Sequence, residues 1–367
     1  MPDIRLQRMA KVLVNYSVEV KPGERLAITS PAAGAPLITE IYREAIRAGA
    51  FPETFISLPG LAEILYKEGS DEQITHIPQP QRLIYEEYET QIGLWADTNT
   101  KALSNVDHSR MALAQKASRD LLETYLRRSM EGTFRWVLAL YPTDASAQDA
   151  EMSLSEFEDF AYRACFLDDE DPVARWRELS AQQEQRVRWL KGKRTVHLRG
   201  KDTDLTLSIE GRPFINCDGK KNFPDGEFFT SPVEDSANGH IRYSFPCSFN
   251  GVSVEDVYLR FENGVVVEAT AAKGQDYLDQ MLSVDEGARR LGEFAFGNNP
   301  YVDRCIRHTL FDEKMAGTVH LALGKSIPDS LGVNNSAIHW DMVCDLRRGS
   351  EIRVDGELFC KDGQFVV

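Results

Sequence analysis

The sequence has no apolar run that approaches the roughly 18 residues needed for a membrane-spanning helix. Its opening residues, Met1 to Arg5, also do not begin the apolar segment of a secretory signal. The 367 residues carry 57 acidic and 42 basic side chains, a formal net charge of −15, and no long lysine and arginine block interrupts this excess. Such a charge opposes nonspecific binding to nucleic acid or to an anionic membrane. We therefore expect a cytoplasmic protein with neither of these partners.

Cysteine is scarce and irregularly spaced. The six cysteines form no C-x-x-C pair. This pattern predicts reduced, mostly buried thiols instead of a disulfide framework or a zinc knuckle. The length suggests about two domains at roughly 150 residues each. With 42% hydrophobic and 27% charged residues, the composition is that of a folded globular protein.

The first half of the chain alternates helical patterns with short apolar runs. Helices are predicted over residues 4–18, 36–48 and 109–131, and strands over 24–29, 54–58, 91–96 and 134–140. This alternation is typical of a parallel sheet. A charged helical stretch then occupies residues 154–193. We predict an N-terminal α/β domain over residues 1–193.

After residue 193 the pattern changes to short β-type runs separated by turn residues. The predicted strands are residues 195–198, 205–209, 241–245, 256–261 and 265–269, with Asn263-Gly264 as a hairpin turn. A single helix is predicted over residues 277–291. Residues 194–367 are therefore expected to form a second, strand-rich α+β domain.

Candidate metal ligands are concentrated in this second domain. His339 and Asp341 are two residues apart in a predicted strand, so their side chains point to the same face. Imidazole and carboxylate together suit zinc, manganese, cobalt or iron(II). Three glutamates and a further histidine lie in turn-like or apolar segments: Glu227, Glu293, Glu313 and His320.

Each of these four residues also has an ordinary structural interpretation. Glu227 ends a turn, and Glu293 lies near the end of the predicted helix, where it reads as a surface charge. Glu313 reads as a loop charge and His320 as a core histidine on a strand. No single residue distinguishes these interpretations from a metal site.

Five motifs in order give the chain a resemblance to the M29 family of metallo-aminopeptidases, of the aminopeptidase T and aminopeptidase S type. They are N-x-P-D-G-E at 222–227, R-R-L-G-E at 289–293, T-L-F-D-E at 309–313, H-L-A-L-G at 320–324 and S-A-I-H-W-D at 336–341. The resemblance covers nearly the whole chain, since residues 20–24 and 99–104 are also similar to the family.

The resemblance implies release of N-terminal residues from peptides that have a free N-terminus, through a water activated by two divalent metal ions. The ions would be zinc, cobalt, manganese or magnesium. The positions that match metal ligands are Glu227, Glu293, Glu313, His320, His339 and Asp341. Glu293 or Glu313 would also carry a proton in catalysis. The resemblance further implies a homodimer.

One position departs from the family pattern. A tyrosine commonly stands seven residues after the histidine of the H-x-A-L-G motif and just before a proline, and its hydroxyl would stabilise the tetrahedral intermediate. Here that position is Ile327, followed by Pro328. Isoleucine has no hydroxyl, so this position cannot supply the donor that the family pattern implies.

Two alternatives remain open. The 2,5-dihydroxypyridine dioxygenases are similar in fold and use two histidines and an aspartate to bind one iron(II), for which His320, His339 and Asp341 would serve. Retention of Glu227 and Glu293 argues against this alternative, because extra carboxylates suit two cations better than one. The other alternative is a catalytically weak homologue that binds metal, which Ile327 suggests.

Overall fold

A computed structural model describes residues 3–249 and 252–367. By their internal contacts the residues form two compact units. Unit 1 comprises Met1–Arg175 and Gly219–Pro224, and unit 2 comprises Trp176–Asp218 and Asp225–Val367. Within the described ranges, no helix combines the length and the apolar character needed to cross a membrane.

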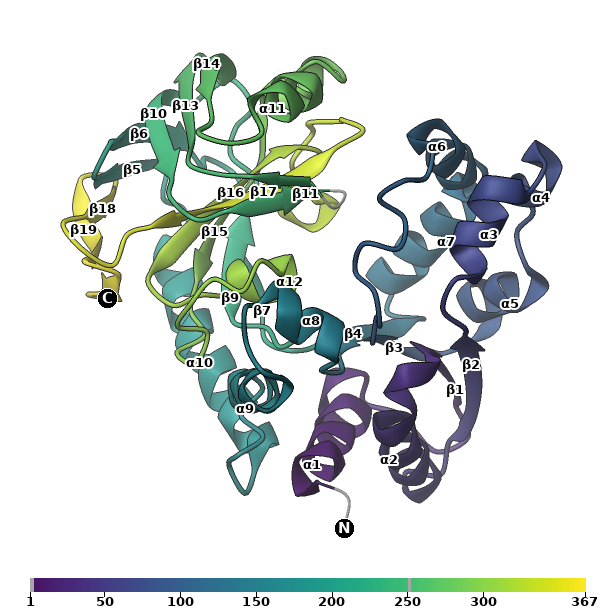
Figure 1. The fold of residues 1–367 in the computed structure, drawn as a ribbon. Coiled ribbons are helices and arrows are strands. Elements are labelled where there is room, and N and C mark those ends of the chain that lie inside the picture. The colour runs from purple at the N-terminus through teal and green to yellow at the C-terminus, as the bar shows by residue number, and fades with distance from the viewer. Residues whose placement is uncertain (1–2, 250–251) are drawn as a thin grey trace. The chain divides into compact units, whose positions relative to one another are not determined.

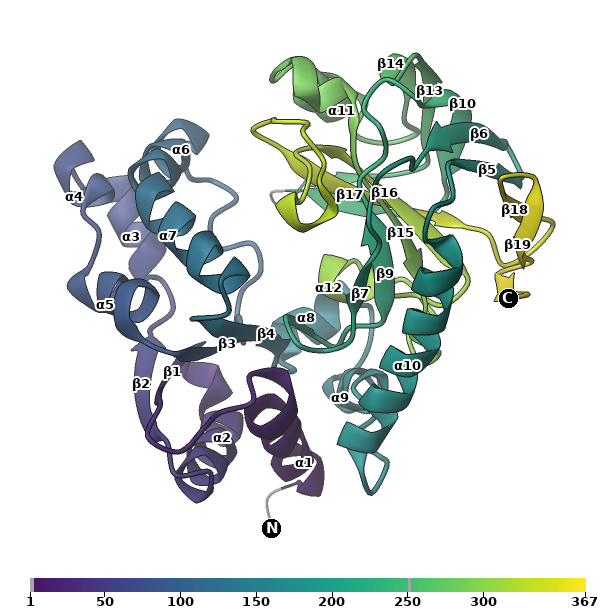
Figure 2. The same cartoon turned by 180° about the vertical axis from the view of Figure 1, so that it is seen from behind.

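Unit 1 is built on a parallel sheet with helices on both faces (Figures 1 and 2). The strand order is β2-β1-β3-β4-β8, for β1 (Arg25–Pro31), β2 (Phe51–Ser57), β3 (Thr90–Trp95), β4 (Arg135–Leu140) and β8 (Asn222–Phe223). The helices are α1 (Ile4–Val12), α2 (Ala35–Arg47), α3 (Leu61–Glu68), α4 (Asp71–Thr75), α5 (Gln79–Glu87), α6 (His108–Ala117), α7 (Arg119–Met130), α8 (Asp144–Asp149) and α9 (Leu154–Ala164). Parallel neighbours need such crossover helices, so the predicted α/β alternation is confirmed.

One predicted helix in unit 1 is interrupted. The helix expected over residues 109–131 is divided into α6 and α7 at Ser118. The Ser118 hydroxyl donates a hydrogen bond to the carbonyl of Ala114, 3.1 Å away. Serine back-bonding of this kind is unfavourable to a continuous helix.

Unit 2 contains an eight-stranded sheet and a five-stranded sheet with one apolar core between them. The larger sheet has the order β14-β13-β10-β6-β5-β18-β19-β20, and the smaller has β17-β16-β15-β9-β7. The strands of the larger sheet are β5 (Thr195–Gly200), β6 (Thr203–Ser208), β10 (Asn238–Tyr243), β13 (Val257–Glu262), β14 (Val265–Thr270), β18 (Glu351–Val354), β19 (Glu357–Lys361) and β20 (Gln364–Phe365). Those of the smaller are β7 (Ile215–Cys217), β9 (Glu227–Thr230), β15 (Leu291–Gly297), β16 (Thr318–Gly324) and β17 (His339–Asp345).

The remaining elements of unit 2 lie around these sheets. They are α10 (Pro172–Leu190), which begins in unit 1, α11 (Gln275–Leu282), α12 (Thr309–Asp312) and the hairpin of β11 (Cys247–Phe249) with β12 (Val252–Val254). The predicted Asn263-Gly264 turn joins β13 to β14 and is confirmed, since both residues have the positive φ that such a turn needs. All six cysteines are free thiols, and four of them are buried.

The helix predicted over residues 277–291 is wrong at its C-terminal end. α11 stops at Leu282, and a short 3₁₀ turn, Glu286–Arg289, replaces the rest. A Cβ on Gly287 would lie 2.6 Å from Asn334 Oδ1, so this turn packs closely against the segment that leads into β17. Strand β15 then begins at Leu291, which moves Glu293 from an expected helix end into the smaller sheet.

Candidate metal centre

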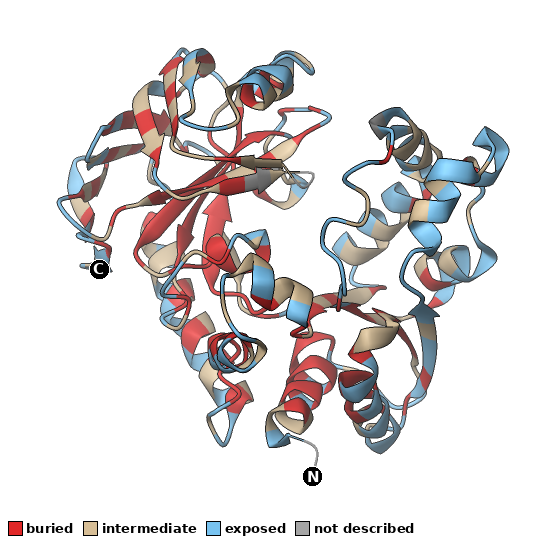
Figure 3. Ribbon diagram, in the orientation of Figure 1, coloured by how far each residue is buried: buried red, intermediate tan, exposed pale blue. Residues whose placement is uncertain are grey.

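The five-stranded sheet has two faces of opposite character. Side chains alternate along each strand, and one set joins the apolar core: Leu291, Phe294, Phe296, Leu321, Leu323, Trp340 and Met342. The side chains at the alternate positions point to the other face and include four of the predicted ligands: Glu293 on β15, His320 on β16, and His339 and Asp341 on β17. Strands β15 and β16 are buried along their whole length (Figure 3). The second face is therefore a polar surface that is buried on β15 and β16 and partly exposed at His339 and Asp341 of β17.

Strand register brings the polar residues of neighbouring strands together. Ala322 of β16 pairs with Glu293 of β15 on one side and with Asp341 of β17 on the other. The alanine between the two carboxylates leaves room for them to approach the same point. His339 pairs with Gly324, which has no side chain and so also leaves room on that face.

Glu293 reaches this face through an irregularity in β15. The pairing of β15 with β16 shifts between Leu291 and Glu293. Such a bulge bends the strand and turns a side chain toward a new direction. A Cβ on Gly292 would lie 2.3 Å from the carbonyl oxygen of Gly324, so only glycine fits at the bulge. This explains the glycine that precedes Glu293 in the motif.

Both histidines present the same ring nitrogen to the centre. His339 Nδ1 lies 2.7 Å from the carbonyl oxygen of Lys325, and His320 Nδ1 lies 3.1 Å from that of Glu313. A carbonyl oxygen can only accept, so each Nδ1 carries the proton and each Nε2 faces the carboxylates. Metal-binding histidines are commonly held in this way.

The Nε2 atoms and the carboxylates form a compact cluster. His339 Nε2 lies 3.3 Å from Glu293 Oε2 and 3.5 Å from Asp341 Oδ1. His320 Nε2 lies 3.4 Å from Glu293 Oε1 and 3.4 Å from Glu227 Oε2. Glu293 therefore stands between two groups of potential ligands and contacts one with each of its oxygens.

Three overlapping sets of these residues have ligand atoms within 4.8 Å of one another: Glu293, His339 and Asp341; Glu227, Glu293 and His320; and Glu313, His320 and Asp341. The structure thus brings all six predicted ligand residues together. Within the described residues, the buried atoms Glu227 Oε2 and Asp341 Oδ1 accept no hydrogen bond, and each has only the ion-pair contact with an imidazole Nε2 given above. Buried carboxylate oxygens normally have hydrogen-bond partners. These two oxygens are therefore suited to coordinate divalent cations.

Lys314 is a buried member of this cluster that the sequence interpretation missed. Its ammonium nitrogen lies 2.5 Å from Glu227 Oε1, 2.6 Å from Glu313 Oε1 and 3.7 Å from Asp225 Oδ1. The lysine follows Asp312 and Glu313 in a run of three charged residues, which is typical of a solvated turn, so the local sequence does not indicate its burial.

Burial and the neighbouring charges shift the pKa values of several groups in the cluster. Burial raises the pKa of Glu227 to about 7, although Lys314 acts against it. Burial lowers the pKa of His320 and of His339, but the neighbouring carboxylates outweigh it and raise the two values to about 9 and about 12. Burial raises the pKa of Asp341, but His339, His320 and Lys314 together outweigh it and lower the pKa. The cluster thus favours cations, and metal binding would displace protons from the imidazoles.

The other histidines whose side chains the structure describes, His76, His197, His240 and His308, lie outside this cluster. His76 is exposed just after α4, and the His197 ring pairs with Asp204 at 2.7 Å on the surface of the larger sheet. His308 precedes α12 and packs edge-on against Phe311, 5.9 Å between ring centroids. The side chain of His108 lies outside the described part of the structure.

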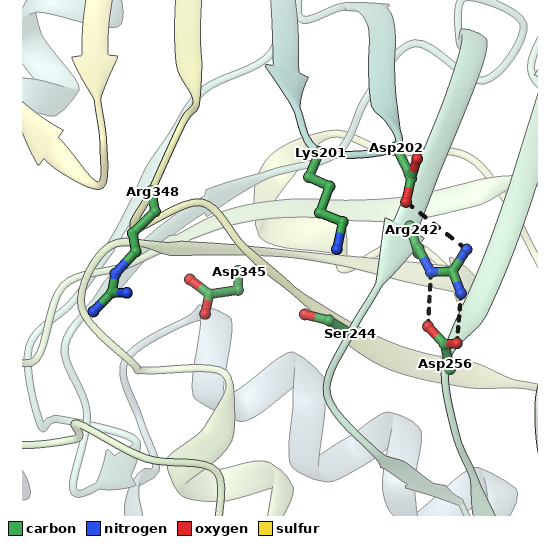
Figure 4. Close-up of a pocket in the computed structure, with 7 residues that line it drawn as sticks. All are labelled: Lys201, Asp202, Arg242, Ser244, Asp256, Asp345 and Arg348. Atoms are coloured by element: carbon green, nitrogen blue, oxygen red, sulfur yellow. Dashed lines mark hydrogen bonds and ion pairs between the residues drawn. The ribbon is translucent and has the colours of Figure 1, made fainter.

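Unit 2 also has a separate hollow of about 460 Å³ (Figure 4). None of the six predicted ligands lines it. Two oxygens of Asp256 lie 2.8 and 2.5 Å from the Arg242 guanidinium, and Asp202 lies 3.9 Å from it. The lysine and two arginines of the hollow thus stand among three aspartates. This balance of charges does not suggest a cation site.

Known proteins are similar to this chain over its whole length. The family described as thermophilic metalloprotease (M29) matches residues 3–365. Aminopeptidase 2 of Geobacillus stearothermophilus is 29% identical, over 98% of this chain and 95% of that protein. Aminopeptidase T of Thermus thermophilus is 26% identical, over 96% and 94%.

Two solved structures share the fold. Wild-type AmpT from Thermus thermophilus superposes with a TM-score of 0.87 at 24% identity and covers 99% of both chains. A 2,5-dihydroxypyridine dioxygenase from Pseudomonas putida gives a TM-score of 0.61 at 15% identity, over 99% of this chain and 97% of that one. The predicted fold class is confirmed, and the dioxygenase is a more distant relative in fold.

Proposed function

Because the chain belongs to the M29 family of metalloproteases, we propose that it is a metal-dependent aminopeptidase that releases N-terminal residues from peptides. Relatives that match nearly the whole chain are named aminopeptidases. One structural observation carries the proposal: two histidines and four carboxylates converge at one polar sheet face, with Glu293 between two ligand groups.

Two divalent cations suit this arrangement. Glu293, His339 and Asp341 would hold one, and Glu227, Glu293 and His320 would hold the other, with Glu313 beside them. Zinc, cobalt, manganese or magnesium bound there would acidify a shared water and polarise the scissile carbonyl.

The two proposed proton carriers differ in their surroundings. Glu293 directs both oxygens at imidazoles, at 3.4 and 3.3 Å. Glu313 directs Oε1 at Lys314, and its side chain is 12% exposed against 5% for Glu293. A proton carrier must reach the leaving amine. The greater exposure of Glu313 supports it as the carrier, with Glu293 fixing the two ligand groups.

The same carboxylates favour the substrate's free amine. A peptide N-terminus is largely protonated near neutral pH, and the excess of carboxylates attracts it. We also propose a homodimer, and a catalytic domain over residues 194–367 with residues 1–193 as a separate α/β domain. The compact units differ from these bounds, because residues 176–193 belong to unit 2 and residues 219–224 to unit 1. Sedimentation velocity of the full chain tests the dimer.

Metal analysis joined to a substrate panel tests the activity. Metal-depleted protein receives Mn²⁺, Co²⁺, Zn²⁺, Mg²⁺ or Fe²⁺ separately and is assayed with free and N-acetylated aminoacyl substrates. We expect two metals per chain and hydrolysis of the free substrates alone, because acetylation removes the charged amine. One iron per chain with oxygen uptake would instead support the dioxygenase alternative. Metal binding with neither reaction would support a catalytically weak homologue.

A further inference from the structure

Lys314 is the buried cation of the centre. Its side chain is fully buried and surrounded by the carboxylates of Glu227, Glu313 and Asp225. Lysine is almost never fully buried unless it is paired. Burial disfavours its charge, but oxygens of Glu227 and Glu313 lie 2.5 and 2.6 Å from its nitrogen and stabilise the ammonium.

The backbone of Lys314 is fixed on both sides. Its N–H donates to the carbonyl of Phe311 at 2.9 Å, and its own carbonyl accepts from the N–H of Asn299 at 2.9 Å. A Cβ on Gly297 of β15 would lie 3.0 Å from the Lys314 carbonyl carbon. The backbone of Lys314 is therefore packed against the ligand sheet and places the side chain among the carboxylates.

The hydrogen bonds of Lys314 lie on one side of the centre. It bonds Oε1 of Glu227, whose other oxygen faces His320 Nε2 at 3.4 Å. It also bonds Glu313. Within the described residues, no hydrogen bond or ion pair joins Lys314 to His339, Asp341 or Glu293. The two proposed metal positions thus differ in how close they lie to a fixed positive charge.

We propose that Lys314 makes the two positions unequal: a divalent cation binds tightly at Glu293, His339 and Asp341, and more weakly at Glu227, Glu293 and His320. This inference rests on the proposed two-metal centre. The ammonium already neutralises part of the charge on Glu227 and Glu313. A second cation there is also repelled by it through a medium that screens charge less than water does. We expect the second affinity to be at least tenfold lower than the first.

Calorimetric titration of the metal-depleted full chain with Mn²⁺, and separately with Zn²⁺, tests the inference. Bound metal is counted by elemental analysis. Lys314→Met removes the charge with little change in length, and Lys314→Gln keeps a hydrogen-bond donor. Lys361→Met is the matched control, because it removes an equal charge from an exposed position in unit 2.

The wild type and Lys361→Met should bind two metals in separated phases. Both Lys314 variants should tighten the weaker phase at least tenfold and leave the tighter phase nearly unchanged. Should Lys314→Met fail to fold, Lys314→Gln provides the same comparison. Metal-induced increases in Tm provide a second readout, because binding to the folded state stabilises it. The Lys314 variants should therefore gain more in Tm at a given metal concentration.

Several results would overturn the inference: two equal affinities in the wild type, a single metal in every variant, or a weaker phase that the Lys314 variants do not tighten. Peptide hydrolysis with any of these results would leave the proposed aminopeptidase standing. The opposite result is also possible. If the two metal affinities differ in the wild type and become similar in the Lys314 variants, the inference is supported. If the same proteins hydrolyse no aminoacyl substrate, the proposed function is overturned.

Discussion

The two faces of the five-stranded sheet use the same strands for opposite purposes. On β15, Phe294 and Phe296 enter the core, while Glu293 faces the candidate metal centre. On β16, Leu321 and His320 divide in the same way. A shift of one residue would exchange the faces and bury the ligands in the core. The apolar face therefore fixes the register on which the polar face depends.

Removing a large side chain from the apolar face should have the largest effect on the stability of the protein. Phe296 is 1% exposed and packs against Phe228 and Phe294, with ring centroids 4.9 and 4.8 Å away. We expect Phe296→Ala to lower the free energy of unfolding by about 3 to 5 kcal/mol, as measured by urea denaturation. Phe51→Ala, at an exposed position in unit 1, is the control and should cost less than about 0.5 kcal/mol. Equal losses in the two variants would contradict the assigned core.

A substitution at Ile327 tests whether a missing hydroxyl limits catalysis at the polar face. This half-buried residue precedes a 3₁₀ turn and lies two residues after Lys325, whose carbonyl holds His339. A hydroxyl donor to a tetrahedral oxyanion contributes of the order of 10² to 10³ in rate, about 2.7 to 4 kcal/mol. We expect Ile327→Tyr to raise turnover toward this limit with unchanged metal content.

Ile327→Phe separates the hydroxyl from the ring and should not raise turnover. If the tyrosine variant still binds two metals but hydrolyses every aminoacyl substrate no faster than the wild type, the missing hydroxyl does not limit the rate. Ile327 would then serve to pack the turn or to shape the substrate pocket.

Breaking the polar face itself should reduce metal affinity. His339→Ala and Asp341→Ala each remove a proposed ligand, and we expect losses of at least roughly 10- to 100-fold, the cost of removing a residue that only supports a ligand. His308→Ala is the matched histidine control, because His308 lies outside the cluster. Equal metal content in all three proteins, measured after dialysis against limiting metal, would refute the proposed ligand set.

The local part of this arrangement is predictable from the sequence. The α/β alternation of unit 1 follows from hydrophobic periodicity and turn residues. The shared face of His339 and Asp341 follows from the two-residue repeat of a strand. Both features depend on residues close together in the chain, so a local pattern contains them.

Other parts depend on contacts between distant segments. The pattern of residues 277–291 favours a helix, but Asp285 and Gly287 pack against the segment that precedes β17, and the chain turns instead. The position of Lys314 among carboxylates depends on Glu227, which is 87 residues away. Burial of a charged side chain is a tertiary property, so its sequence neighbours predict an ordinary surface lysine.

The smallest effect should come from Asp285, which anchors the segment leading into the polar face. Its Oδ1 accepts hydrogen bonds from Ser336 Oγ and the Ala288 N–H, and its Oδ2 accepts one from the Ala337 N–H, all at 2.8 Å. Asp285→Asn keeps the shape but loses the charge and one acceptor. We expect a loss of about 1 to 2 kcal/mol in the free energy of unfolding at pH 7, with metal affinity reduced less than tenfold.

The pH dependence of this loss has a definite sign. Burial raises the pKa of Asp285, but the hydrogen bonds from Ala337, Ser336 and Ala288 outweigh it and hold the pKa below the usual 3.8. A carboxyl with a lowered pKa in the folded state stabilises above its unfolded pKa, and this contribution disappears as the pH falls through the folded value. The difference between wild type and Asp285→Asn should therefore be constant from pH 7 to about 5 and shrink below pH 3.8, as followed by urea denaturation at each pH. A difference that grew on acidification would show that the Asp285 charge does not anchor this segment.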